Sequence, residues 1–353
     1  MKTMKTKWEP FIIDNLADVL SGVDIYSKER IPGATPYITS GTADNGIGYF
    51  VGNYNKSMDS NVISVARNGA VGMAYYHPYT ALFGNDCRRL VLKKHRTPEV
   101  QQFIAYCIRK QRKSFSYSRK LGTTRLRNLR IMLPATVNHQ PNYDYMEQYV
   151  KKHVRYKQKQ YIDYADSKLK VLGKIKVITP LKDKSWKAFN AFGDNGLFNI
   201  QTTSSSIDKK NLISDNDKSI PYVTRSGGSN GIAQFVSKVN LKQGYDQANV
   251  ITVGLDTQTA FYQPYKFVTG QNIQIVMGNN LSPYVLQFLV PLLRKQMIAK
   301  FNWGGNGATL GRMKRLKILL PVTDAGMPDY DYMEQYIKNM LIKKYKQYLN
   351  FAE

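Results

Sequence analysis

The strongest candidate for a binding function is a run of basic residues that contains no acidic residue. Residues 109–130 include nine Lys and Arg and no Asp or Glu. Ser, Tyr, Thr and Asn are interleaved with them, and Gly122 allows backbone to approach a ligand closely. Basic side chains bind phosphates, whereas uncharged polar and aromatic tips can reach base edges. The run therefore predicts contact with nucleic acid, although a charge run more often marks a solvated face.

A second basic run lies near the other end of the chain. Residues 294–317 hold seven Lys and Arg, again without a carboxylate, and include Trp303 among several glycines. Because the same pattern recurs, a binding loop is favoured over an ordinary solvated face in both places.

A turn with divergent polar residues is another candidate for DNA contact. "VARNGAVG" carries Arg67 and Asn68, and its counterpart carries Asp256, Thr257 and Gln258, while the flanking strands agree. Such divergence is typical of a recognition loop, although any surface loop can drift. Asn45-Gly46 and Asn230-Gly231 are instead interpreted as hairpin turns. The residues predicted to bind DNA are Arg67, Asn68, Arg119, Lys120, Thr123, Thr124, Arg125, Arg127, Arg225, Thr257, Gln258, Trp303, Asn306, Thr309, Arg312 and Lys314.

Signatures of catalysis are missing from the sequence. There is no glycine-rich cofactor or phosphate loop, no Asn-Pro-Pro-aromatic tetrapeptide, and no His or Cys spacing suited to a metal. Pro328-Asp329 with Glu334 superficially resembles a nuclease motif, but no Lys follows two residues after Glu334. The position of these acids at the start of a predicted helix explains them better. We therefore expect no catalytic residues, no bound metal and no cofactor of its own.

The overall charge supports a polyanionic partner. Lys and Arg number 51 against 25 Asp and Glu, which gives a formal net charge of +26. Double-stranded DNA is the first candidate, and an anionic membrane surface is the rival. The longest apolar runs fall short of the roughly 20 residues of a membrane span. With two cysteines interpreted as reduced thiols and no secretory signal, we expect a cytoplasmic protein.

An internal repeat organises these candidates. Asp144–Tyr149 and Asp331–Tyr336 have the same sequence, residues 35–51 resemble 220–236, and residues 122–134 resemble 307–321. Each copy reads as short strands broken by Gly-containing turns, a helix, the basic loop, a strand ending at Leu-Pro, and a closing helix. The sequence predicts an α+β fold with two tandem, pseudo-twofold-related recognition domains. The predicted boundaries are 1–141 for domain 1, 142–173 for its helix, 174–328 for domain 2 and 329–353 for the last helix.

Apolar stripes with a 3.6-residue period mark the closing helices, expected at about Tyr143–Leu172 and Asp329–Phe351. Each stripe could pack on its own domain, or the two helices could pack on each other, antiparallel, as a spacer. The second interpretation is preferred because the helices lie between and after the domains. The residues assigned to helix or partner packing are Met146, Val150, Val154, Tyr161, Met333, Ile337 and Leu341.

The chain resembles the DNA-specificity subunits of restriction–modification systems, in type I and type IIB enzymes. The resemblance rests on "NGIGYFV", on "TTRLRNLRIMLP" and "LGRMKRLKILLP", and on the repeated Tyr-Met-Glu-Gln-Tyr. It covers nearly the whole chain, twice. The short closing helices and their lead-in, "QPNYDYMEQY", depart from the type I pattern and lean towards type IIB.

The resemblance implies a non-catalytic subunit in which each repeat reads one half of a bipartite, asymmetric DNA site. Methyltransferase or fused restriction–modification subunits would dock on the helices and supply S-adenosylmethionine and Mg²⁺ chemistry. The alternative is a repressor-like or architectural DNA-binding protein that acts alone.

Overall fold

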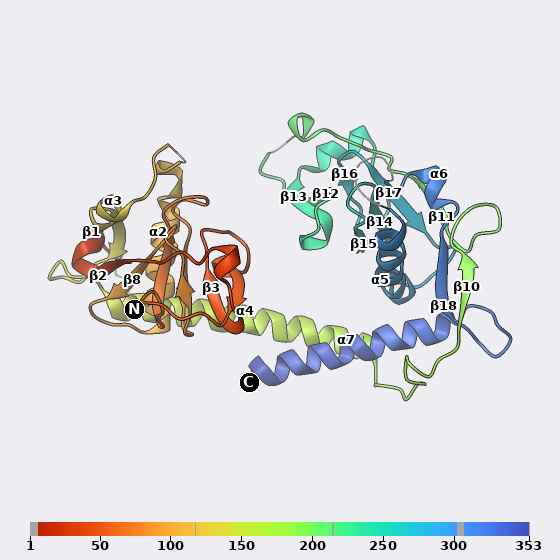
Figure 1. Ribbon diagram of the computed structural model, residues 1–353, viewed down its shortest axis with the longest axis horizontal. Coiled ribbons are helices and arrows are strands. Elements are labelled where there is room, and N and C mark those ends of the chain that lie inside the picture. Colours follow the sequence, from red (N-terminus) through yellow and green to blue (C-terminus); the bar gives the residue numbers. More distant parts are fainter. Residues whose placement is uncertain (1–5, 117, 214, 302–306, 353) are drawn as a thin grey trace. The chain divides into compact units, whose positions relative to one another are not determined.

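The chain folds as two compact units of mixed helices and strands (Figure 1). The structure, a computed structural model, describes residues 6–116, 118–213, 215–301 and 307–352. The units are Met1–Tyr161 and Ile162–Glu353, and their boundary lies inside helix α4 (Tyr143–Leu172). The prediction of a mixed α and β fold with two tandem domains is confirmed.

The first unit consists of short strands, one long helix and several single turns. Its elements are β1 (Trp8–Ile12), α1 (Ile13–Leu16), β2 (Ala17–Ser21), η1 (Ser27–Glu29), β3 (Pro32–Ile38), η2 (Asp44–Gly46), β4 (Ile47–Val51), β5 (Val62–Ala66), β6 (Ala74–His77), β7 (Leu82–Phe83), β8 (Cys87–Leu92), α2 (Pro98–Lys110), η3 (Arg112–Ser114), α3 (Thr123–Arg127), β9 (Arg130–Pro134) and most of α4.

The second unit repeats this order after the end of α4. Its elements are β10 (Trp186–Asn190), β11 (Asn199–Thr202), η4 (Lys209–Asn211), β12 (Ile220–Val223), η5 (Ser229–Gly231), β13 (Ile232–Val236), η6 (Lys238–Gln243), β14 (Val250–Gly254), β15 (Ala260–Gln263), β16 (Val268–Thr269), β17 (Ile273–Met277), α5 (Pro283–Lys300), α6 (Leu310–Met313), β18 (Lys317–Pro321) and α7 (Tyr330–Ala352).

Both units build the same three sheets. In the first, the strand orders are β2-β8-β5-β6, β4-β3-β7 and β1-β9; in the second they are β11-β17-β14-β15, β13-β12-β16 and β10-β18. The two-stranded sheets have matching registers, because Trp8 pairs with Pro134 and Trp186 pairs with Pro321. Each repeat therefore starts and ends on neighbouring strands.

The Asn-Gly turns lie where hairpins were predicted. Asn45 and Asn230 adopt φ of 53° and 54°, and the glycines that follow them also have positive φ. These turns join the antiparallel pairs β3–β4 and β12–β13. Asn and Gly tolerate this left-handed backbone, which explains their choice.

Helix starts are specified by local hydrogen bonds that recur in both units. Thr97 and Ser282 cap α2 and α5, each followed by a proline at the first helical position. The side chain of Asn142 accepts from the Tyr145 amide at the start of α4 at 3.0 Å. Asp329 does the same for the Tyr332 amide in α7, also at 3.0 Å.

The first turns of both closing helices pack on their own units. Met146 is fully buried in the core of the first unit and Met333 in that of the second. Val150 and Ile337 pack against the same cores. The preferred assignment of these four residues to helix–helix packing is therefore wrong. A helix that leaves a domain keeps its first apolar positions on that domain, and the period alone does not reveal which neighbour they face.

The other three residues assigned to helix or partner packing, Val154, Leu341 and Tyr161, lie outside these two cores. Val154 is 44% exposed, so it packs in neither core. Leu341 lines a groove between α5 and α7, next to Leu292, within the second unit. Tyr161 is the last residue of the first unit.

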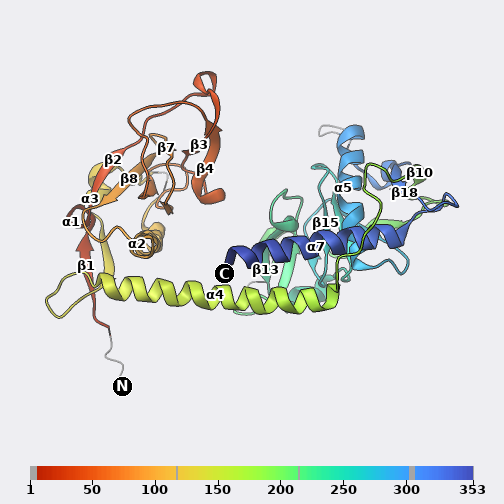
Figure 2. The same cartoon turned by 90° about the horizontal axis from the view of Figure 1, so that it is seen from below.

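Contact between the two closing helices occurs further along them, inside the second unit. The Tyr164 ring of α4 meets the Tyr345 ring of α7 edge-on, with centroids 6.2 Å apart. From Ile162 to Leu172, α4 runs antiparallel to α7 (Figures 1 and 2). Of the described helices, none combines the length and apolar content needed to cross a membrane.

An aromatic contact repeated in both units ties each sheet to its closing helix. Trp8 stacks on Phe103 at 6.0 Å, and Phe103 meets Tyr149 of α4 edge-on at 5.6 Å. Trp186 and Phe288 repeat the stack at 6.3 Å, and Phe288 meets Tyr336 of α7 at 5.5 Å. Each such pair adds about 0.5–1.5 kcal/mol beyond its burial. The first turns of each closing helix thus pack as part of the domain that they follow.

Candidate nucleic-acid interface

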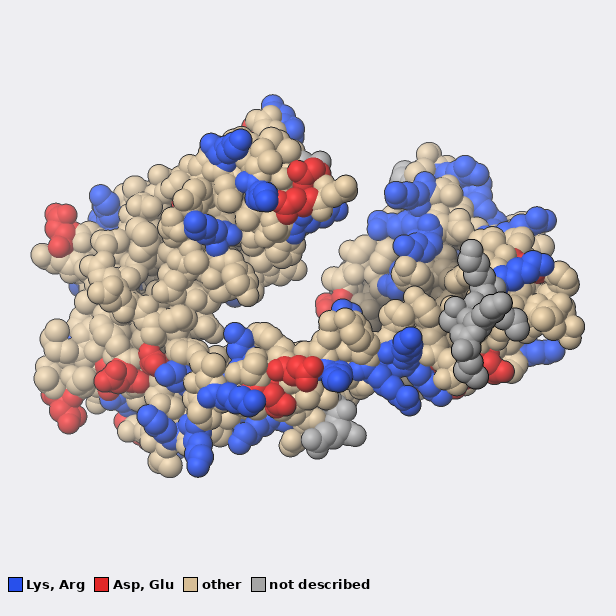
Figure 3. Space-filling view, turned by 180° about the vertical axis from the view of Figure 1, so that it is seen from behind, with Lys and Arg blue, Asp and Glu red and all other residues tan. Residues whose placement is uncertain are grey.

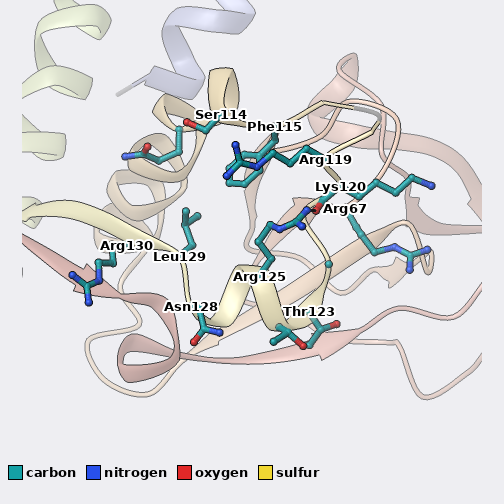
Figure 4. A pocket seen from close by; sticks show the side chains of 13 residues that line it. Arg67, Ser114, Phe115, Arg119, Lys120, Thr123, Arg125, Asn128, Leu129 and Arg130 are labelled. Atoms are coloured by element: carbon teal, nitrogen blue, oxygen red, sulfur yellow. Dashed lines mark hydrogen bonds between the residues drawn. The ribbon is translucent and has the colours of Figure 1, made fainter.

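A basic cleft of about 760 Å³ opens on the first unit between the end of β5 and helix α3 (Figure 4). The acid-free run supplies most of its wall. The lining residues are Arg67, Gln111, Ser114, Phe115, Arg119, Lys120, Gly122, Thr123, Thr124, Arg125, Asn128, Leu129 and Arg130.

Buried anchors fix the wall of this cleft. Leu121 and Leu126, on either side of the start of α3, are fully buried in the core. The Leu121 amide donates to the Arg67 carbonyl at 3.2 Å, which joins the loop before α3 to the end of β5. The basic loop is therefore held to the first unit in two ways, by the burial of Leu121 and Leu126 and by the backbone hydrogen bond to Arg67.

A buried guanidinium lies beneath the cleft. Arg88 of β8 is 5% exposed and donates to Thr123 Oγ1 at 2.7 Å and to the Asn85 carbonyl at 2.8 Å. Burial lowers the pKa of Arg88, and the neighbouring positive charge of Arg67 acts in the same direction. An arginine stays protonated in proteins, so Arg88 adds a fixed positive charge behind the α3 wall.

An ion pair occupies the sheet side of the cleft. Arg67 Nη2 donates to Asp86 Oδ1 at 3.1 Å, with side chains 31% and 47% exposed. Asp86 lies just before β8, and the Arg67 Nε is buried without a hydrogen-bond partner. One edge of the guanidinium is therefore held by protein.

Most of the predicted DNA-binding residues of the first unit come together in the cleft. Arg67, Arg119, Lys120, Thr123, Thr124 and Arg125 all line it. Asn68 does not, and its Oδ1 is buried without a partner.

Arg127 is placed differently from its neighbours in the basic run. Its Nε lies 3.6 Å from Asp14 Oδ1, so a carboxylate of α1 balances its charge. It does not line the cleft, although it was predicted to bind DNA together with Arg119 and Arg125, which do.

The second unit gathers its candidates around Asp256, in the turn between β14 and β15. The carboxylate of Asp256 pairs with Arg225 and accepts from Asn272 Nδ2 at 3.3 Å. Gln258 Nε2 donates to the Asp256 carbonyl at 2.9 Å. The Ala308 amide donates to the Leu255 carbonyl at 2.8 Å, which brings the end of the second basic loop to this turn.

The other candidates of the second unit lie near that loop. Arg312 Nη1 donates to the Gly307 carbonyl at 3.1 Å. Thr309 and Lys314 are exposed on either side of α6, and Thr257 is exposed in the turn. Trp303 and Asn306 lie outside the described residues.

Sequence reasoning missed residues that line the cleft and residues that bond to its lining. Asp86 and Arg88 lie in "FGNDCRRLVL", where two arginines follow a cysteine inside an otherwise apolar strand. Arginines at buried strand positions are unusual, and that was the available signal. Gln111 and Asn128 flank predicted residues and gave no signal of their own, whereas Arg130 is the last residue of the acid-free run.

Two other polar clusters have structural explanations. His77 is fully buried, with its Nε2 2.8 Å from Ser64 Oγ and its Nδ1 3.1 Å from Tyr79 Oη. Burial lowers its pKa to about 4, so it is neutral. Asp329 caps α7 and pairs with Lys184 at 2.7 Å, while Glu334 pairs with Lys338, which accounts for the nuclease-like acids.

Comparison with known proteins adds the family. Residues 5–163 and 187–350 both match the type I restriction modification DNA specificity domain. The chain belongs to this family. Its two specificity domains coincide with the two repeats, and each contains one of the basic loops.

Relatives of this specificity-domain protein include a type II restriction enzyme specificity subunit, S.BcgI of Heyndrickxia coagulans. It is 35% identical over 144 residues, which are 40% of this chain and 42% of that protein, so the match spans less than half of the relative. Among solved structures, a type I S subunit from M. genitalium has a TM-score of 0.48 at 15% identity, covering 100% of this chain and 94% of that one. The HsdS subunit from Thermoanaerobacter tengcongensis has a TM-score of 0.30 at 10% identity, with coverages of 99% and 92%.

Proposed function

We propose that this protein is a non-catalytic DNA-specificity subunit of a restriction–modification complex, with each unit binding one half of a bipartite DNA site. The observation that carries the proposal is the pair of specificity-domain matches, one on each unit. The basic cleft of the first unit and the second basic loop supply phosphate contacts at equivalent places. Lys and Arg also outnumber Asp and Glu on the face shown in Figure 3.

The two half-sites should have different sequences. The units share their sheet order but carry different side chains where β5 and β14 end, with Arg67 and Asn68 in one and Leu255 and Asp256 in the other. Base edges are distinguished by the donors and acceptors presented to them. An asymmetric target follows from this difference.

Methyltransferase or fused restriction–modification subunits are the proposed partners, with S-adenosylmethionine and Mg²⁺ chemistry on those subunits. The groove of about 640 Å³ between α5 and α7, lined by side chains such as Pro291, Leu292 and Met340, offers an apolar protein-binding surface. The buried, unpaired thiols of Cys87 and Cys107 suit a cytoplasmic protein.

The test is to map DNA methylation by single-molecule sequencing in a host that carries the intact locus and in one that lacks only this gene. We expect a bipartite, asymmetric motif that disappears with the gene. In addition, the purified chain should transfer no methyl group from labelled S-adenosylmethionine to DNA. Methyl transfer by the pure chain would contradict the proposal, and a binding motif without methylation at it would favour the stand-alone DNA-binding protein.

A further inference from the structure

In each unit, a partly exposed arginine forms an ion pair with an aspartate beside the basic loop. Arg67 follows β5 directly and pairs with Asp86, while Arg225 follows β12 and pairs with Asp256 in the β14–β15 turn. The side chains of both arginines are partly exposed, at 31% and 42%.

Backbone hydrogen bonds show that these two pairs occupy one framework. The Arg67 amide donates to the Asp86 carbonyl at 2.8 Å and its carbonyl accepts from Leu121. In the second unit, the Leu255 amide donates to the Asn272 carbonyl at 3.0 Å, and the Leu255 carbonyl accepts from the Ala308 amide. Leu255 is thus the positional counterpart of Arg67, and the second unit supplies its arginine from the neighbouring strand connection instead.

The other arginine–carboxylate pairs of the described residues lie elsewhere. Arg89 is buried, with 8% of its side chain exposed, and pairs with Asp59 inside the first unit. Arg127 and Asp14 lie outside the cleft. Among the described residues, the pairs that follow β5 and β14 lie where a basic loop meets the sheet, because the Arg67 carbonyl accepts from Leu121 and the Leu255 carbonyl accepts from Ala308.

A paired carboxylate changes what an arginine can bind. A phosphate is repelled by the Asp86 or Asp256 carboxylate, whereas the O6 and N7 acceptors of guanine are uncharged and fit the fork of a guanidinium. Arg119 and Arg125 have no carboxylate partner among the described residues, so they suit phosphates. The carboxylate also fixes the fork in one orientation, which a base contact needs more than a phosphate contact does.

We propose that Arg67 and Arg225 each read a guanine in their own half-site, with Asp86 and Asp256 as the positioning residues. The inference rests on the proposed function and adds the residues that set the sequence. Because the two arginines come from different strand connections, the two guanines should occupy different positions within their half-sites.

The test uses purified full-length protein and a pool of random double-stranded DNA, with enriched sequences read for Arg67→Lys and Arg225→Lys. Lysine keeps the charge but loses the two-pronged donor. Arg67→Lys should reduce the preference for one guanine in one half of the motif by about 5- to 150-fold and leave the other half unchanged. Arg225→Lys should do the reverse, so each variant is the control for the other, and Arg127→Lys should change neither half.

Other outcomes separate the inference from the function beneath it. A uniform loss of binding across all sequences would mean a phosphate contact and overturn the inference, as would an unchanged motif. Asp86→Asn and Asp256→Asn should weaken the same guanine preferences in a protein with the wild-type melting temperature. If the wild-type chain enriches no motif in this pool and the locus gives no methylation motif, the proposed function fails instead.

Discussion

Arg125 and Arg127 lie on one turn of helix, yet their charges are available to different degrees. Arg125 is exposed at the cleft, whereas Asp14 balances Arg127. We expect Arg119→Ala with Arg125→Ala to reduce the slope of log affinity against log salt concentration by about 1.8, because each lost phosphate contact removes roughly 0.9. Binding to non-specific duplex at several salt concentrations measures it. Arg127→Ala is the matched control, and an equal effect of Arg127→Ala would contradict the assignment of the cleft.

His77 should make the first unit sensitive to acid. Its pKa is lowered to about 4 by burial, whereas an unfolded histidine titrates near 6.5. Between these two pH values the unfolded chain therefore binds more protons than the folded chain. The contribution of His77 to the free energy of unfolding is fully present above pH 6.5 and is lost as the pH falls towards 4. The expected loss is about 2 kcal/mol from pH 7 to pH 5.

A glutamine already fills the equivalent place in the second unit, where Gln263 Nε2 donates to Thr252 Oγ1 at 3.1 Å. His77→Gln should therefore keep the hydrogen bond to Ser64 and remove most of the acid sensitivity. Urea unfolding at pH 7 and pH 5 compares it with the wild type and with the exposed control His153→Gln. Equal losses in all three proteins would show that His77 is not the titrating group.

At the scale of elements, the closing helices should respond to substitution according to the unit each residue faces. Met146 is fully buried in the first core, whereas Val154, two turns later, is 44% exposed. Met146→Ala should lower the free energy of unfolding by about 2–5 kcal/mol through the lost burial and the cavity. Val154→Ala should change it by less than about 0.5 kcal/mol. Denaturant unfolding measures both, and a larger effect at Val154 than at Met146 would contradict this assignment of the residues.

The closing helices also show how far sequence reasoning reached. Their limits, Tyr143–Leu172 and Tyr330–Ala352, follow from a period that is local and strong. The partner that Met146 faces does not follow, because one stripe serves either neighbour. Pairing of Trp8 with Pro134 is equally hidden, since it joins residues far apart in the chain.

The candidate site likewise contains residues that the sequence predicted and residues that it did not. The acid-free run located Arg119 and Arg125, because composition is visible in a sequence. Asp86 and Arg88 reach the site only through the sheet order β2-β8-β5-β6, which no local pattern predicts. A single turn such as α3 separates Arg125 from Arg127 without leaving any period to detect.

At the scale of the whole molecule, the repeat allows one domain to be exchanged for the other. Replacing Trp8–Pro134 with Trp186–Pro321 keeps both ends of the transferred segment on paired strands. The Trp186–Phe288 stack would then meet Tyr149 of α4 in place of Tyr336. We expect a folded protein whose methylation motif contains the second half-site twice.

The methylation motif of the intact locus carrying the chimera measures this result. Inverted copies are expected from antiparallel closing helices, and direct copies would contradict that arrangement. A folded chimera that keeps the original asymmetric motif would show that specificity does not reside in the exchanged segment.

The pairing of the first and last strands of each repeat has a consequence for biosynthesis. β9 (RIMLP) and β18 (KILLP) are near-copies, so β1 could accept either as its partner during folding. Domains tend to fold as they are synthesised, at roughly 5–20 residues per second, which puts β18 roughly 10–40 s behind β9. The first repeat can therefore close on β9 before its competitor leaves the ribosome. Refolding from denaturant removes this head start, so exchange of β18 for β9 should be more frequent in refolded protein than in protein made in the cell.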